Sequence, residues 1–219
     1  MEGKLEFGSS DVSLWKQALS SYPTRLQAVK KAEIVELDSF YTKQLPTLLH
    51  QRDPNPHITK SELSKLMQWK LTRGKWRPRL MSFVSSLDEE QVKYASEKAF
   101  GSLPDLSEAV SALTTLKGVG PATASAILAS YAPHIAPFMS DEAMLAALGN
   151  AKEYTLKQYL SFAEKLQAKA KELSIGGVVF TPSDVERALW ATEISLKIPA
   201  STVKNSSPER KKKRQRKSQ

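Results

Sequence analysis

The segment LKGVGPATASAIL, residues 116–128, has the residue types and spacing of a phosphate-binding turn. Gly118 and Gly120 interrupt a helical pattern, and Pro121, a favourable first residue of a helix, restarts it at once. We therefore expect two helices joined by a short hairpin, KGVG, with Val119 packed between them. Amides of the hairpin and of the second helix's first turn would point outward at the positive end of the helix dipole, which suits a phosphate. A plain helix–helix turn with a glycine cap is the alternative.

A second group of residues suited to binding lies in QWKLTRGKWRPRL, residues 68–80. Five basic residues occur within ten positions, with no acidic residue among them, and they alternate with Trp69 and Trp76. Arginine and lysine contact phosphates, and tryptophan can stack on a nucleobase. Gly74 is expected to end one helix and Pro78 to begin the next. The alternative is that both tryptophans belong to the core and the charges form a solvated loop.

The net charge of +9 is concentrated at the C-terminal end. Eight basic residues and one acidic residue lie from Lys204 onward, so this tail carries +7 and the rest of the chain only +2. Such a run is typical of a nuclear import signal, and it could also bind DNA without sequence preference. A generic solvated charge run is the alternative. The expected import residues are Lys211, Lys212, Lys213, Arg214, Arg216 and Lys217.

Composition excludes several classes of protein. The chain has no cysteine, which rules out disulfides and thiolate metal sites, and its three histidines are scattered along the sequence. We therefore expect no metal and no cofactor. No apolar run is long enough for a membrane span, and the first residues, MEGKLEFGSS, lack the apolar core of a secretion signal. A monomer without membrane contact is expected.

Helical signals extend through most of the sequence, so the expected fold class is all-α. The segment from Leu26 to Tyr41 keeps a helical spacing of apolar residues, and Thr59 with Glu62 forms a capping box. Residues 156–173 make the clearest amphipathic helix, while GGVVF, residues 176–180, is ambiguous. The expected organisation is a flexible N-terminus at 1–10, one helical domain at 11–198, and a disordered basic tail at 199–219.

The order of residues in the hairpin resembles the helix-hairpin-helix motif of DNA-binding proteins. In the helix-hairpin-helix DNA glycosylase superfamily, an aspartate lies about twenty residues beyond the second hairpin glycine, at the start of a helix. Asp141 lies twenty-one residues after Gly120, in the segment SDEAM. This segment and QWKLTRGKWRP together resemble the Amun-like proteins, a eukaryotic group placed in that superfamily and associated with the nucleus. The resemblance implies a glycosylase-like helical fold with Asp141 as the catalytic carboxylate.

The chemistry implied for Asp141 is hydrolysis of an N-glycosidic bond. Positive charge builds on the sugar as the base leaves, and a fixed anion stabilises that charge and orients the attacking water. The base must first flip out of the duplex, at a cost of roughly a few kcal/mol. From the residues alone, Asp141 is equally suited to favour the helix dipole after the N-cap Ser140. The two roles are compatible.

One departure from the superfamily pattern limits the chemistry that the resemblance implies. Members that also cleave the strand carry a lysine two residues past the second hairpin glycine, and Ala122 occupies that position here. We therefore expect a nuclear DNA-binding protein that resembles a monofunctional glycosylase. The alternative is an inactive glycosylase fold that binds DNA or protein. The predicted DNA-binding residues, including the hairpin at 117–120, are Lys117, Gly118, Val119, Gly120, Thr123, Lys70, Arg73, Lys75, Trp76 and Arg77.

Overall fold

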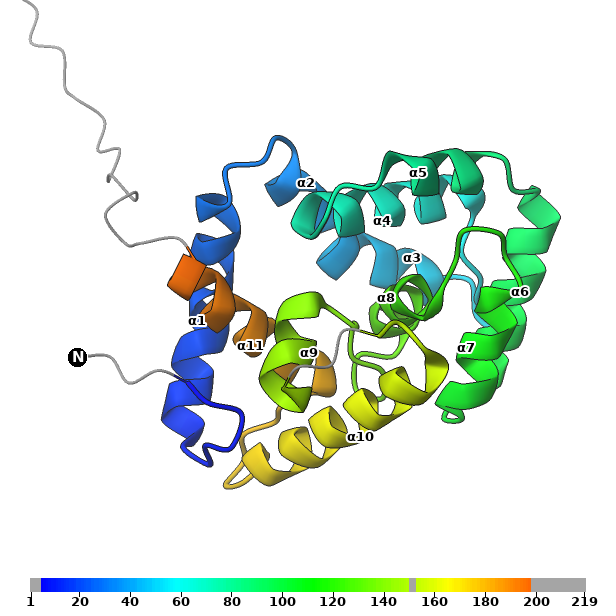
Figure 1. The fold of residues 1–219 in the computed structure, drawn as a ribbon. Coiled ribbons are helices and arrows are strands. Elements are labelled where there is room, and N and C mark those ends of the chain that lie inside the picture. Colours follow the sequence, from blue (N-terminus) through cyan, green and yellow to red (C-terminus); the bar gives the residue numbers. More distant parts are fainter. Residues whose placement is uncertain (1–4, 150–152, 198–219) are drawn as a thin grey trace, which may run out of the picture.

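A computed structural model describes residues 5–149 and 153–197, and this part of the chain is all-helical without a strand. None of its helices is long and apolar enough to cross a membrane. The elements, shown in Figure 1, are α1 (Val12–Ala28), α2 (Ile34–Ser39), the π-helical η1 (Phe40–Gln44), α3 (Leu45–His50), α4 (Lys60–Arg73), α5 (Pro78–Ser85), α6 (Glu89–Gly101), α7 (Leu106–Thr114), α8 (Pro121–Tyr131), α9 (Asp141–Leu148), α10 (Leu156–Leu173) and α11 (Pro182–Lys197).

Local sequence explains where several of these helices begin. The Thr59 hydroxyl accepts the Glu62 amide and the Glu62 carboxylate accepts the Thr59 amide, so the predicted capping box is confirmed. Ser140 caps α9 through the amide of Ala143. Gly74 ends α4 and Pro78 begins α5, as the sequence predicts.

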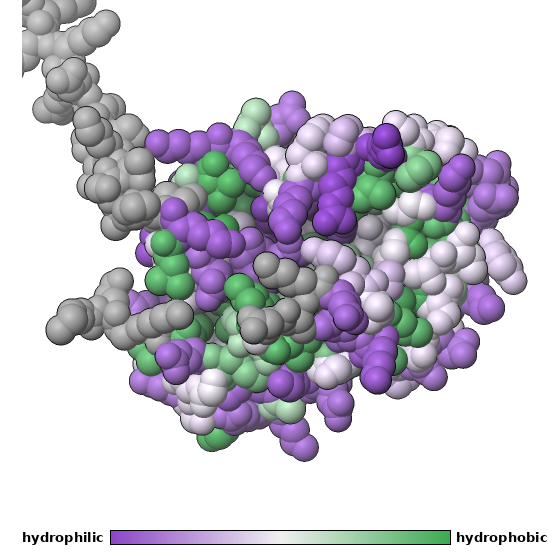
Figure 2. Space-filling view, in the orientation of Figure 1, coloured by the Kyte–Doolittle hydropathy of each residue, from purple (hydrophilic) through white to green (hydrophobic). Residues whose placement is uncertain are grey.

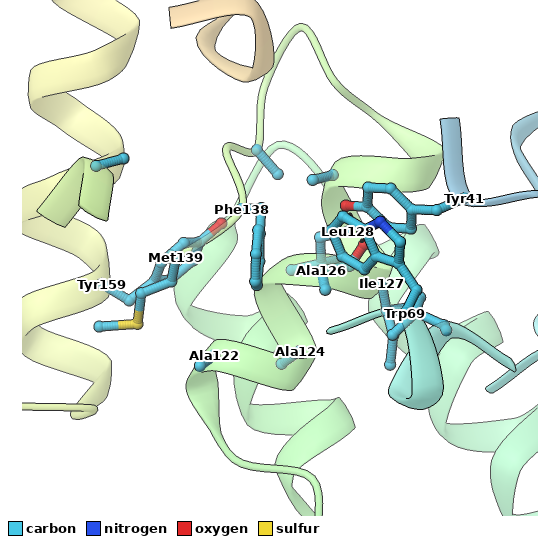
Figure 3. Packing of buried hydrophobic residues seen from close by; sticks show 14 of the residues in the cluster. Tyr41, Trp69, Ala122, Ala124, Ala126, Ile127, Leu128, Phe138, Met139 and Tyr159 are labelled. Atoms are coloured by element: carbon cyan, nitrogen blue, oxygen red, sulfur yellow. Dashed lines mark hydrogen bonds between the residues drawn. The ribbon is translucent and has the colours of Figure 1, made fainter. Parts of the chain in front are cut away.

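Helix α8 lies at the centre of the fold and contacts α3, α4, α6, α7 and α10 (Figure 1). All nine residues from Ala122 to Ser130 are buried, on every side of the helix. Their small side chains allow neighbouring helices to approach from every side, whereas Tyr131 at the end is only half-buried. Figure 3 shows α8 beside Phe138 and the stacked rings of Tyr41 and Trp69, whose centroids lie 3.5 Å apart.

The remaining helices cover this centre and form one hydrophobic core that extends from Leu5 to Ile194. The first and last helices, α1 and α11, pack along each other, and α11 also contacts α9 and α10. The apolar face predicted for residues 156–173 is the buried face of α10, which confirms that amphipathic helix. The first and last helices are therefore joined through the core, and α9 contacts both long helices α10 and α11.

Several predicted boundaries differ from the structure. Within the N-terminal segment predicted to be flexible, Leu5 is buried and the Ser9 carbonyl accepts the Trp15 indole at 2.8 Å, so residues 5–10 pack on the domain. The apolar spacing after Leu26 does not form one long helix, because α1 ends at Ala28. GGVVF is a turn without strand structure. The predicted tail at 199–219 and its six import residues lie outside the described residues.

Candidate functional site

A cavity of about 430 Å³ brings together three segments that are distant in sequence. It is lined by the end of α4 with the loop that follows, by the hairpin before α8, and by the start of α9, with the end of α11 closing one side. This volume lies in the range of small-ligand sites. On the face shown in Figure 2, hydrophilic side chains predominate in the region between α2 and α9.

The hairpin has the predicted form, a short turn between two helices. Helix α7 ends at Thr114, and the Val119 amide bonds to the Leu116 carbonyl at 3.0 Å, which closes the turn. Val119 is buried, as predicted. Gly118 has a φ of +87°, and a Cβ there would lie 2.6 Å from the Cβ of Phe83 in α5. Gly118 is therefore required both by the backbone conformation and by the close packing of the hairpin on α5.

Gly120 is exposed, and its backbone conformation does not require glycine. Its φ is −97°, and a Cβ at this position would meet no atom within 4 Å. It is also the N-cap of α8, a position where Ser or Asp would satisfy a free amide, yet α8 has no side-chain cap. The absence of a side chain therefore leaves the start of α8 open to an external acceptor beside the cavity. Thr123, which also lines the cavity, is buried.

The loop after α4 exposes three of its predicted binding residues. Trp76 is 61% exposed, and Lys75 and Arg77 are exposed beside it. Trp69, by contrast, is buried in the core. The loop is anchored from beneath, because the Lys31 ammonium donates to the carbonyls of Thr72 at 2.6 Å and Gly74 at 2.8 Å.

Arg73 corrects a sequence-based expectation, since its side chain is only 2% exposed and does not reach a surface phosphate. Its guanidinium donates to both carboxylate oxygens of Glu186, at 2.9 and 3.2 Å, and lies over the rings of Tyr22, Trp69, Phe138 and Trp190. Burial acts to lower the pKa of Arg73, but the charge of Glu186 raises it above the ordinary value. Burial raises the pKa of Glu186, and the hydrogen bonds from Arg73 and Ser140 oppose that rise. The two groups therefore form a buried ion pair.

Two buried hydrogen bonds position Asp141 at the start of α9. The Ser140 hydroxyl donates to Glu186, so the cap of α9 is attached to the buried ion pair. The Met139 amide donates to the Ser125 hydroxyl of α8 at 2.9 Å. The segment that leads to Asp141 is thereby fixed against both α8 and α11, and the aspartate is held at the cavity wall.

Both carboxylate oxygens of Asp141 have partners. The Tyr154 hydroxyl donates to Oδ1, and the Lys75 ammonium lies 3.1 Å from Oδ2. Burial acts to raise the pKa of Asp141, but the hydrogen bonds from Tyr154 and Lys75, with the charges of Lys75 and Arg77, lower it below the ordinary value. Asp141 is therefore an anion at neutral pH. Burial and the neighbouring Asp141 raise the pKa of Tyr154 to about 12, so its hydroxyl stays protonated and donates.

Basic groups outnumber acidic groups around the cavity. Two carboxylates line it, those of Asp141 and Glu142, and Lys197 lies 3.1 Å from Glu142. The basic residues that line it are Lys31, Lys70, Arg73, Lys75, Arg77 and Lys197. The charge of Arg73 is neutralised by Glu186, and the remaining excess of positive charge suits a polyanion.

The structure brings most of the predicted site residues to this cavity. Gly118, Gly120, Thr123, Lys70, Lys75, Arg77 and Asp141 line it. Val119 is buried beneath the hairpin, and Lys117 is exposed with its ammonium 5.2 Å from the centroid of the Phe83 ring. Sequence reasoning missed Tyr154 and Glu186, because a single tyrosine in a loop and a single glutamate in a helix give no signal of what they contact.

The fold and the site together describe an all-helical protein with a hairpin, a basic loop and a fixed carboxylate around one cavity. Comparison of the chain with protein-family models, with curated proteins and with solved structures found no match.

Proposed function

We propose that this protein binds DNA in the nucleus through the hairpin and the basic loop and releases a flipped base in the cavity, with Asp141 as the catalytic carboxylate. The observation that carries the proposal is that a single cavity adjoins Gly120, Lys75, Arg77 and Asp141. An anion fixed at its wall is suited to stabilise the sugar cation that forms as the base leaves. The basic tail would supply nuclear import and additional non-specific affinity.

The test is a screen for base release over duplexes that carry different lesions. Full-length protein in excess is incubated with each duplex, and hot alkali then converts abasic sites into strand breaks. Base release from at least one lesion supports the proposal. Duplex binding without release from any lesion would contradict the catalytic part.

A second candidate function is DNA binding without chemistry, and one observation favours it. The contacts of Asp141 with Tyr154 and Lys75 occupy both carboxylate oxygens, which suits a purely structural helix start. In that case the hairpin and loop would bind a duplex, and Asp141 would contribute only to the stability of α9. The lesion screen separates the two candidates.

Gly120→Asp is expected to give a folded protein with slightly higher stability and weaker DNA binding. The new side chain enters open space and can cap α8, which contributes a few tenths of a kcal/mol. Its charge would repel a phosphate held by the α8 amides. Because hydrogen bonds to charged groups contribute about 1.5–3 kcal/mol, affinity should fall by about tenfold or more. Duplex titration measures the affinity, and thermal unfolding measures the stability.

The uncharged variant Gly120→Asn is the matched control, since it has the size of aspartate without the charge. It should retain more affinity than Gly120→Asp. Equal affinity of the wild type and a folded Gly120→Asp would remove the hairpin from the interface.

Replacing Lys75 and Arg77 by glutamine is expected to reduce the salt dependence of duplex binding. The slope of log K against log salt concentration is negative, and each lost phosphate contact reduces its magnitude by about 0.9. Both residues are exposed, so the fold should persist. Affinity is measured at several salt concentrations, with Arg73 left intact because it is buried. An unaltered slope would favour the solvated-loop interpretation.

A further inference from the structure

The acceptor side chains that line the cavity are already engaged. Tyr154 donates to one carboxylate oxygen of Asp141, and Lys75 lies 3.1 Å from the other. Glu142 pairs with Lys197, also at 3.1 Å. Both carboxylates of the cavity lining therefore have partners within the protein, and an incoming hydrogen-bond donor would have to compete with them.

Two donors at the same cavity are unengaged. Lys70 lies in the last turn of α4 and Thr123 in the first turn of α8, and neither side chain forms a hydrogen bond or an ion pair within the described residues. Thr123 is only 2% exposed, so bulk water has little access to its hydroxyl. Burial and the charge of Arg77 lower the pKa of Lys70 to about 8, which leaves its amine mainly protonated and able to donate at neutral pH.

The wall behind these two groups holds further donors without partners. The Nε and Nη1 atoms of Arg73 and the Nε1 atom of Trp190 are buried and form no hydrogen bond. Both residues line the cavity, although their side chains are at most 2% exposed and lie behind its surface. The positive ends of such N–H groups favour an oxygen atom in front of them and disfavour another N–H group.

We propose that the cavity selects a base that carries a carbonyl oxygen over a base that carries an exocyclic amino group. A carbonyl oxygen accepts hydrogen bonds, whereas the amino group of adenine or cytosine donates them. A carbonyl base would supply the acceptor that Lys70 and Thr123 lack. An amino base would leave these buried donors unpaired, which is unfavourable. The inference rests on the proposed function, since a base must enter the cavity, and it names the class of base.

The experiment compares the affinities of the full-length protein for duplexes that differ at a single base. Hypoxanthine is compared with adenine, and uracil with cytosine, because each pair exchanges a carbonyl for an amino group. Each base stands opposite a tetrahydrofuran abasic analogue, so that no base pair holds it in the stack. A 2′-fluoro substituent on its sugar blocks base release, so that binding is measured without chemistry.

We expect the carbonyl member of at least one pair to bind about tenfold or more tightly than the amino member, as for a hydrogen bond to a charged donor. The pair that shows the preference reveals whether a purine or a pyrimidine fits the cavity.

Thr123→Val and Lys70→Met test the two donors separately. Valine keeps the shape of threonine without the hydroxyl, and methionine is a long, uncharged replacement for lysine. Both variants should lower the ratio of the two affinities, and Lys70→Met should lower it more because hydrogen bonds from charged donors are stronger. If Lys70 only contacted a phosphate, Lys70→Met would weaken both duplexes equally and leave the ratio unchanged.

Two further variants serve as controls. Thr123→Ser keeps the hydroxyl and should keep a preference that Thr123→Val reduces. Lys157→Met makes the lysine replacement at an exposed position of α10 outside the cavity and should keep the wild-type ratio. Circular dichroism confirms that each variant is folded.

The outcomes separate this inference from the proposed function. Duplex binding without a preference, a preference for the amino members, or a preference that survives in both folded Lys70→Met and folded Thr123→Val overturns selection by these donors and leaves DNA binding intact. Failure to bind any of the duplexes overturns the proposed function and this inference with it.

Discussion

Asp141→Asn is expected to lower the single-turnover rate of base release by about 10²–10⁴-fold while duplex binding persists. The substitution keeps the shape of the side chain but removes the anion, so it can neither stabilise the sugar cation nor accept a proton from water. The cost in stability should be about 0.5–2 kcal/mol, the sum of one favourable charge at a helix start and one partly exposed ion pair with Lys75. A large decrease in the rate of base release with only a small decrease in the free energy of unfolding would therefore identify a catalytic role.

The measurement uses a lesion that the wild type processes, with protein in excess over duplex. Glu89→Gln is the matched control, because Glu89 is the first residue of α6 as Asp141 is of α9, and it does not line the cavity. It removes one charge at a helix start, while the glutamine oxygen can still accept the Lys60 amide, and it should keep the wild-type rate. A folded Asp141→Asn with an undiminished rate would show that Asp141 is structural.

The ionisation of Asp141 adds a check on the same variant. Because the folded-state pKa is lowered, the carboxylate stays charged until the pH falls below the ordinary aspartate value, about 3.9. The contribution of this charge to stability is present above that value and is lost as the pH falls through the folded-state pKa. The wild-type rate should therefore show no loss from Asp141 protonation between pH 5 and neutrality. Even the lower limit of this range lies about one unit above the ordinary aspartate pKa.

Arg73→Met is expected to lower the free energy of unfolding by about 3–5 kcal/mol, the largest stability effect predicted for this chain. The substitution leaves Glu186 as an unpaired charge in the core, where both side chains are at most 4% exposed. In a domain of this size the loss corresponds to a decrease in Tm of roughly 6–20 °C. Denaturant unfolding of the purified protein measures the free energy directly.

The double variant Arg73→Met with Glu186→Gln tests the cause of that loss. It removes both charges, and the glutamine oxygen still accepts the hydrogen bond that Ser140 donates in the wild type. Replacing a buried pair by uncharged groups is often close to neutral, so most of the lost stability should return. A double variant no more stable than Arg73→Met would show that packing of the guanidinium against its aromatic neighbours matters more than the charge.

Local structure in this protein was largely predictable from sequence. The capping box at Thr59, the cap at Ser140 and the amphipathic face of α10 depend on residues within one or a few turns of each other. The hairpin was predictable for the same reason, since Gly118 and Pro121 act on their own backbone. The all-helical class follows from the sum of these local signals.

Tertiary structure decided which of two similar residues reaches the surface. Trp69 and Trp76 both lie among basic residues, yet only Trp76 is exposed, because α4 packs Trp69 against Tyr41 and Phe138. Arg73 is drawn into the core by Glu186, a partner 113 residues away. No local pattern reports such a contact.

The same distinction applies to the candidate site. A hairpin, a basic loop and an aspartate at a helix start could be predicted from the sequence, because each is specified by its own neighbours. The packing of distant elements brings these features to one cavity and places Tyr154 and Lys75 against Asp141. Side-chain exposure, pairing and pKa depend on which distant elements pack together, and that is settled only when the whole core forms.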